Sequence, residues 1–118
     1  MDNKRAEVYS ALKTDATLKA IINERVYWHY KKDGAVYPQV IYYLINSVPH
    51  YSFGNKEDIT KLYYQIDVWD NTGSNSVGME EAINDIMIGL GFQRTSGIDQ
   101  YDSESKIYRT VMRYEGLF

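Results

Sequence analysis

The chain contains no cysteine and only two histidines among its 118 residues. The absence of cysteine excludes disulfides, zinc–thiolate sites and thiol catalysis, so we expect the protein to be made in a reducing cytoplasm. The two imidazoles, His29 and His50, are far apart in the sequence, and no HExxH-type pair is present. We therefore interpret each as a surface or interface residue and not as a metal ligand or general base.

Long hydrophobic runs and concentrated positive charge are also absent. The longest apolar run, Val40–Ile45, is far shorter than a membrane span, and the N-terminal residues lack the apolar segment of a signal peptide. The net charge is −3, and the densest basic pairs are Lys4–Arg5 and Lys31–Lys32. Nucleic-acid-binding proteins usually carry a basic stripe, so we expect no sequence-specific nucleic-acid partner and no membrane partner.

What the chain does contain is typical of one soluble globular domain. We expect residues 1–118 to form that single domain, because the composition is 44% hydrophobic and 25% charged. The twelve tyrosines are unusual. Tyrosine favours strands and is also enriched at protein interfaces, and here most of the tyrosines lie in segments that we predict to be strands.

Hydrophobic periodicity predicts an α+β fold in which an antiparallel sheet of four to five strands has helices packed on one face. The expected order is α-α-β-β-β-α-β-β. The predicted helices are 3–13, Ala16–Ile22 and 77–89, and the predicted strands are Arg25–Tyr30, Gln39–Ser47, Ile59–Trp69, Phe92–Ser96 and Lys106–Glu115. The segments Pro49–Asp58 and Gly97–Ser105 are expected to be loops, and Lys32–Gly34 a turn.

The strand–turn–helix unit at Lys61–Gly91 is the most informative part of the pattern. In its strand, the even-numbered residues from Leu62 to Val68 are expected to face the core, and Lys61, Tyr63, Gln65 and Asp67 to face water. Many enzymes place a phosphate loop or a nucleophile at such a junction. Here the junction reads DNTGSNS, which supplies only turn and capping residues.

Two acidic clusters are weighed as catalytic or metal sites and rejected. The first cluster lies on a solvated helix face. Acid–base catalysis by paired carboxylates needs burial to separate their pKa values, and such a face does not provide it. The second cluster does not have the residue spacing of a calcium-binding loop. The clusters are Glu80, Glu81 and Asp85, and Asp99, Asp102 and Glu104. We therefore assign no catalytic, cofactor-binding or metal-binding residue.

Exposed aromatic and arginine residues are the remaining candidates. Tyr51 and Phe53 lie in a polar segment, where they either fold back as a lid or contact a partner. Arg109 and Arg113 lie on the odd-numbered face of the last strand, where they either cover the edge of the core or pair across a subunit contact. The sequence leaves both alternatives open.

Four segments, in their order and spacing, resemble a known family. They are VYSALKTDATLKAII followed by RVYW, YPQVIYYLINSVP, LYYQIDVWDNT and YDSESKIYRTVMRY. Over about residues 8–114 the chain resembles the tail completion proteins, also called tail-to-head joining proteins, of long-tailed bacteriophages and prophages. The third segment is the most specific, because that family also places a Gln-hydrophobe-Asp-hydrophobe-Trp strand just before its second helix.

The resemblance implies a structural virion protein with no enzyme activity and no cofactor. Such a subunit assembles with copies of itself into a ring, a hexamer, that caps the tail tube and joins it to the head connector or head completion protein. It is located at the head–tail interface of the virion and assembled in the host cytoplasm. On this interpretation the candidate interaction residues are His50, Tyr51, Phe53, Lys56, Arg109 and Arg113.

Two other functions are weighed against this one. A small nucleic-acid- or ligand-binding accessory domain would use an aromatic sheet face made by Tyr63, Gln65 and Tyr108, but stacking platforms normally come with a basic groove. A hydrolase with Asp67 or Asp70 as its acid ranks last, because the sequence offers no partner base.

Overall fold

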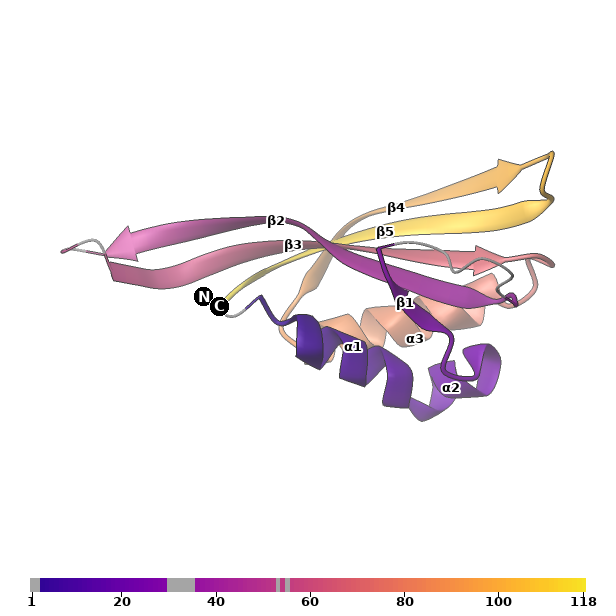
Figure 1. Ribbon diagram of the computed structural model, residues 1–118, viewed down its shortest axis with the longest axis horizontal. Coiled ribbons are helices and arrows are strands. Elements are labelled where there is room, and N and C mark those ends of the chain that lie inside the picture. The colour runs from indigo at the N-terminus through magenta and orange to yellow at the C-terminus, as the bar shows by residue number, and fades with distance from the viewer. Residues whose placement is uncertain (1–2, 30–35, 53, 55) are drawn as a thin grey trace.

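The protein is described here from a computed structural model that covers residues 3–29, 36–52, 54 and 56–118, with the backbone alone described for residues 52 and 56–58. The predicted order of helices and strands is confirmed (Figure 1). The elements are α1 (Arg5–Thr14), α2 (Ala16–Ile22), β1 (Val26–Trp28), β2 (Gln39–Ser52), β3 (Lys56–Asp70), α3 (Ser76–Gly89), β4 (Gln93–Asp102) and β5 (Ile107–Leu117). The predicted turn at 32–34 lies outside the described residues.

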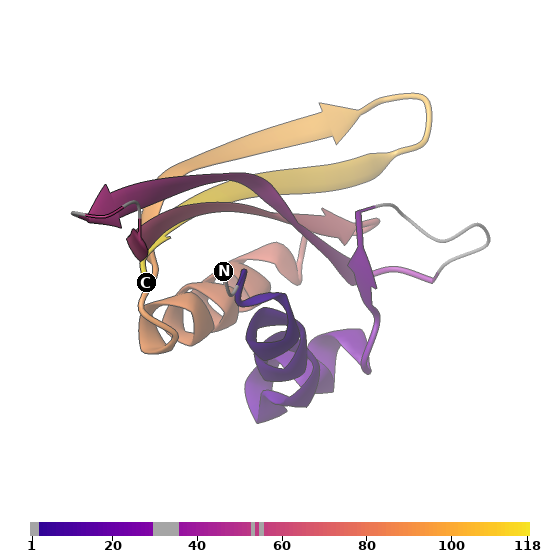
Figure 2. The same cartoon turned by 60° about the vertical axis from the view of Figure 1, so that its left-hand side comes forward.

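The described strands form one five-stranded sheet in the order β1-β2-β3-β5-β4. Every neighbouring pair is antiparallel except β1 and β2, which run parallel. The helices cover one face of this sheet and leave the other face open (Figure 2). The expected α+β class is therefore confirmed. No described helix has the length and apolar character that a membrane span requires.

The core lies between the sheet and the three helices. On β3, the predicted core residues Leu62, Tyr64, Ile66 and Val68 are each at most 1% exposed. The helices contribute apolar stripes to the same cluster, which confirms that helical periodicity marks their buried faces. The helical core residues are Val8, Leu12, Leu18, Ile22, Met79, Ala82, Ile83 and Met87.

The expectation that the odd-numbered face of β3 is wet is wrong at two positions. Gln65 is 5% exposed and Asp67 is 3% exposed. β3 is the middle strand, so side chains of β2 and β5 flank it on both sides, with Tyr43 and Arg113 in register with Gln65. A strand with two neighbours can therefore bury polar side chains on a face that no helix covers.

The two segments that we expected to be loops are largely strand. β2 continues to Ser52 and β3 begins at Lys56, so most of the segment 49–58 belongs to the two strands of a hairpin. β4 continues to Asp102, which leaves only a short turn before β5. Alternation of polar and apolar residues disappears where both faces of a strand are exposed, although its backbone hydrogen bonds remain. Periodicity therefore could not reveal these extensions.

Candidate functional site

The β2–β3 hairpin extends beyond the rest of the sheet as a two-stranded arm (Figure 1). On one side of β3, pairing with the C-terminal strand ends at Lys61 and Leu117, followed by two backbone hydrogen bonds between Thr60 and Phe118 at 2.6 and 2.9 Å. Before Thr60, β3 pairs with β2 alone. A two-stranded ribbon is only marginally stable in water, so the arm contributes little to the core and presents both faces to its surroundings.

The structure places three of the sequence-predicted contact residues in this arm. His50 is exposed and pairs with Ile59, and the Tyr51 side chain is 57% exposed. Lys56 begins β3 opposite Ser52. Phe53 lies outside the described residues. The open question about Tyr51 is therefore decided in part, because this side chain is not folded back as a lid.

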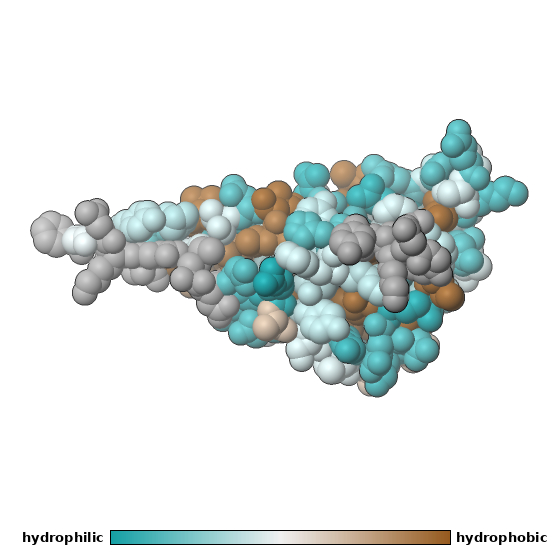
Figure 3. Space-filling view, viewed as in Figure 1, coloured by the Kyte–Doolittle hydropathy of each residue, from teal (hydrophilic) through white to brown (hydrophobic). Residues whose placement is uncertain are grey.

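Apolar side chains are exposed along the open face from the arm towards the body. Ile45, Val48 and Ile59 are each 44–46% exposed, and Leu117 is 66% exposed. Figure 3 shows hydrophobic atoms at the surface over the middle of the hairpin, between polar atoms. Such side chains on an otherwise polar surface are suited to contact with another protein.

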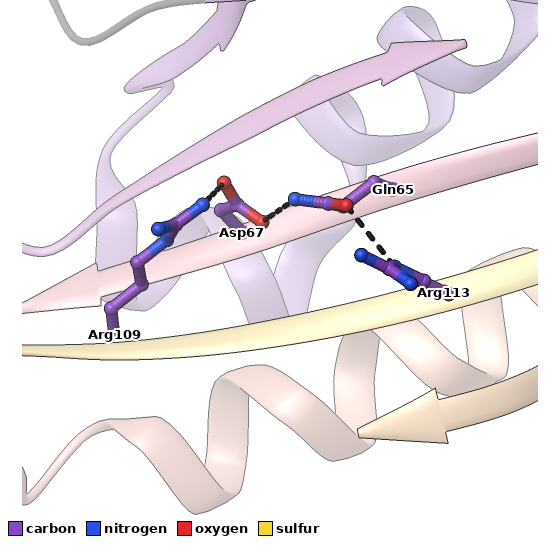
Figure 4. Close-up of polar contacts among 4 residues, drawn as sticks. All are labelled: Gln65, Asp67, Arg109 and Arg113. Carbon is purple, nitrogen blue, oxygen red and sulfur yellow. Dashed lines mark hydrogen bonds and ion pairs between the residues drawn. The ribbon is translucent and has the colours of Figure 1, made fainter. Parts of the chain in front are cut away.

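A chain of polar contacts crosses the open face of the sheet and connects both candidate arginines (Figure 4). The Arg109 guanidinium donates from Nη2 to Asp67 Oδ2 at 2.8 Å, and Gln65 Nε2 donates to Asp67 Oδ1 at 2.9 Å. Arg113 Nε donates to Gln65 Oε1 at 3.3 Å. We call these four residues the Asp67 network. In it, one buried carboxylate contacts Arg109 directly and is linked to Arg113 through Gln65.

The two arginines differ in how firmly they are held. Arg109 also lies over the Trp69 ring, with its guanidinium carbon 5.1 Å from the ring centroid. Arg113 is exposed, and its terminal amino groups have no hydrogen-bond partner among the described residues. Beside the network, burial and then the Asp67 carboxylate raise the pKa of the Tyr43 phenol. Arg109 is therefore held by two contacts within the protein, whereas the terminal amino groups of Arg113 are not.

The aromatic sheet face of the accessory-domain hypothesis is not a single surface. Tyr63 and Gln65 lie on the open face, and Gln65 is almost fully buried. Tyr108 lies on the opposite, helix-covered side, where its ring packs 4.7 Å from that of Tyr101. The three residues therefore do not form one stacking platform.

Neither Asp67 nor Asp70 is free to act as the catalytic acid that the hydrolase hypothesis requires. Asp67 is engaged in the Asp67 network. Asp70 is fully buried and accepts backbone hydrogen bonds from Thr72 at 3.3 Å and from Asn75 at 3.1 Å, which orders the turn before α3. The junction residues thus serve as turn residues, as predicted, but the N-cap residue Asn75 makes no side-chain capping hydrogen bond to α3.

The described residues contain no group of three or more His, Asp or Glu side chains placed to hold a metal ion. The two histidines are separated: His29 stacks on Tyr43 with centroids 5.3 Å apart, and His50 lies on the arm.

A surface groove of about 580 Å³ lies beside the start of α3 and is lined by hydroxyl and aromatic groups and by Asp99. Nearby, burial and then the Asp99 charge raise the pKa of Glu80.

Sequence reasoning missed a surface on α1 and β1. Arg5, Tyr9 and Lys13 are spaced by four residues and so share one side of α1, and Trp28 on β1 is 46% exposed. The Arg5 guanidinium lies 4.4 Å from the Trp28 centroid, and Lys13 Nζ lies 5.3 Å from the Tyr9 centroid. We call these four residues the cation–aromatic surface. The spacing was readable in the sequence, but Trp28 joins the set only through the fold.

The family model described as "Tail completion protein gp17" matches residues 6–117 of the chain. The chain belongs to this family. It is accordingly a structural protein of phage-type virion tails. Among solved structures, this tail completion protein is similar to a chain of the "Virion of native gene transfer agent (GTA) particle", with 15% identity and a TM-score of 0.74 over 93% of this chain and 90% of that one. That likeness shows a shared fold. No curated protein matches the chain.

Proposed function

We propose that this tail completion protein is a ring-forming subunit, six copies of which cap the tail tube and join it to the head connector. The observation that carries the proposal is the family match over residues 6–117, together with a fold found in a phage-like particle. The role is structural and needs no catalytic group. The whole chain, residues 1–118, acts as one unit within the ring.

The arm supports a coupling role. It projects from the body and is held by one strand pair, and its exposed residues include His50, Tyr51 and Ile59. A projecting ribbon can reach a neighbouring protein and become ordered against it, at little cost to the subunit core. We assign contact with the tail tube protein or the head connector to His50, Tyr51, Phe53 and Lys56 of the arm, and contact between subunits to Arg113, with Arg109 positioned by Asp67.

The charge balance also fits a ring through which DNA passes. The chain has 16 acidic and 13 basic residues, so the ring as a whole repels phosphate. DNA affinity rises with the number of cations that contact phosphates, and a lining with few free cations lets DNA move through it.

The arm assignment is tested by shortening the hairpin. Residues 50–59 are removed, and Pro49 and Thr60, which face each other across the hairpin, are joined by Asn-Gly, a two-residue turn that suits a hairpin. Thr60 is retained because it pairs with Phe118. In particles assembled with this variant, we expect separate heads and tails. A normal yield of joined particles contradicts the arm assignment.

The matched control shortens the other hairpin. Residues 103–106 are replaced by Asn-Gly between Asp102 and Ile107, which also face each other. This variant should join heads and tails normally.

The ring itself is tested by native mass spectrometry of the purified protein, free and bound to its tail tube. Six copies on the tube are expected, and single copies under both conditions contradict the ring.

A further inference from the structure

The cation–aromatic surface carries two cations that form no close ion pair among the described residues. Arg5 and Lys13 have no carboxylate within 4.0 Å among the described residues; each instead lies over an aromatic ring. By contrast, the neighbouring Lys19 is paired with Glu24 at 3.2 Å. Exposed Trp, Tyr and Arg side chains that lie together are the residues that most often dominate protein interfaces.

A complementary surface lies on the outer side of α3. The stripe that faces away from the core is Val77, Glu81, Asp85 and Ile88, with Val77 63% exposed and Ile88 56% exposed. α3 contains no lysine or arginine, and neither carboxylate forms an ion pair within the described residues. We call these four residues the acidic surface. It combines two negative charges with an exposed apolar side chain at each end.

The two surfaces belong to opposite sides of the subunit. α1 and α3 contact each other, but α1 also contacts β1 and β2, whereas α3 contacts β3 and β4, and β1 and β4 are the two edges of the sheet. In Figure 1, α1 and β1 lie towards the viewer, and α3 lies behind them. Different surfaces on opposite sides allow head-to-tail association, which closes into a ring when the rotation between copies permits it.

We propose that the cation–aromatic surface of one copy packs against the acidic surface of the next copy. The inference rests on the ring proposed above and names a contact between its subunits in addition to the one assigned to Arg113. Arg5 and Lys13 are eight residues apart on α1, or about 12 Å, and the stripe from Val77 to Ile88 on α3 spans about 16 Å. Glu81 and Asp85 are four residues apart, or about 6 Å, and lie between Val77 and Ile88. The long side chains of Arg5 and Lys13 therefore converge to reach them.

A nucleic acid fits the cation–aromatic surface less well. Two cations, with Glu7 on the same helix, make few phosphate contacts, and DNA-binding surfaces gain their affinity from many. The acidic surface also has no role in that alternative, whereas it is required when the occupant is a second copy. Charge complementarity across one chain therefore favours self-association.

The contact is tested by reversing charges on each surface and then on both. One variant carries Arg5→Glu and Lys13→Glu, a second carries Glu81→Lys and Asp85→Lys, and a third combines all four changes. Each reversal alone should weaken association at least about tenfold, and the combined variant should recover it, because opposite charges again face each other. Lys106→Glu, in the exposed β4–β5 turn, is the matched control and should associate like wild type.

Association is measured by analytical ultracentrifugation and by counting copies on isolated tail tubes, with circular dichroism to confirm that each variant is folded. If wild type forms rings and the reversed variants form them equally well, this contact is wrong while the ring proposal stands. If wild type forms no ring in solution or on tubes, the ring proposal fails and the contact with it. DNA binding that is lost in the first variant, without loss of self-association, overturns the inference in favour of a nucleic acid.

Discussion

Removing the charge of Asp67 tests how much the Asp67 network contributes to the free energy of unfolding. In Asp67→Asn, Gln65 can still donate to the remaining carbonyl oxygen, but the new amide group points N–H donors at the Arg109 guanidinium. The wild-type contact is a charge-assisted hydrogen bond of 2.8 Å to a carboxylate whose side chain is 4% exposed. The substitution therefore leaves Arg109 without its anion.

The expected cost follows from burial on the two sides. Breaking a fully buried ion pair costs about 3–5 kcal/mol, and a hydrogen bond to a charged group contributes about 1.5–3 kcal/mol. The Arg109 side chain is 33% exposed, so water compensates part of its loss. We expect the free energy of unfolding to fall by about 2 kcal/mol, which lowers the melting temperature by about 6–10 °C for a domain of this size.

Urea unfolding followed by circular dichroism measures this change. Glu104→Gln is the matched control, because it removes one negative charge from an exposed turn, and we expect it to change the free energy of unfolding by less than about 0.5 kcal/mol. A double-mutant cycle with Arg109→Gln should give a coupling energy of about 1–2 kcal/mol. If Asp67→Asn unfolds like wild type, the Asp67 network does not stabilise the sheet, and our account of that face is refuted.

Two further predictions concern α3. Asp70→Ala removes a fully buried acceptor of two backbone hydrogen bonds, so it should lower the free energy of unfolding by about 2–3 kcal/mol in the same urea assay, and a loss below about 0.5 kcal/mol contradicts its role in ordering the turn before α3. Glu80→Gln should stabilise the protein at pH 7, because burial raises the pKa of Glu80 in the folded state and so disfavours its charged form there. The contribution of Glu80 to stability is retained below its unfolded pKa and is lost as pH rises through its folded pKa. The stability gained by Glu80→Gln should therefore vanish towards pH 4. A gain that is independent of pH contradicts this reasoning.

The fold was predictable wherever one face of an element is buried and the other is wet. Alternation from Leu62 to Val68 gave the core face of β3 correctly, and helical spacing located all three helices. Periodicity gives no signal where that contrast is missing. Residues 49–51 and 97–102 are strand, although their side chains show no buried face, and Asp67 is buried by neighbouring strands that the local sequence does not reveal.

The candidate site was predictable only in part, because contacts between distant segments decide it. Sequence reasoning singled out Arg109 and Arg113 but left their role open, since Asp67 and Gln65 reach them only when β3 and β5 pair. Local polarity singled out Tyr51 but could not decide between a lid and an exposed side chain, because the extension of β2 to Ser52 is not visible in the sequence. The cation–aromatic surface was missed, because Trp28 meets Arg5 through the docking of α1 against β1.

A ring of this tail completion protein at the junction of head and tail should be visible in assembled particles. Electron cryomicroscopy of particles assembled with the chain gives both the position of the protein and the number of its copies. The account predicts one ring of six copies at the head-proximal end of the tail tube, with the β2–β3 arms reaching a neighbouring protein. Density for the chain along the tube or at the distal tip, or single copies at the junction, contradicts the account.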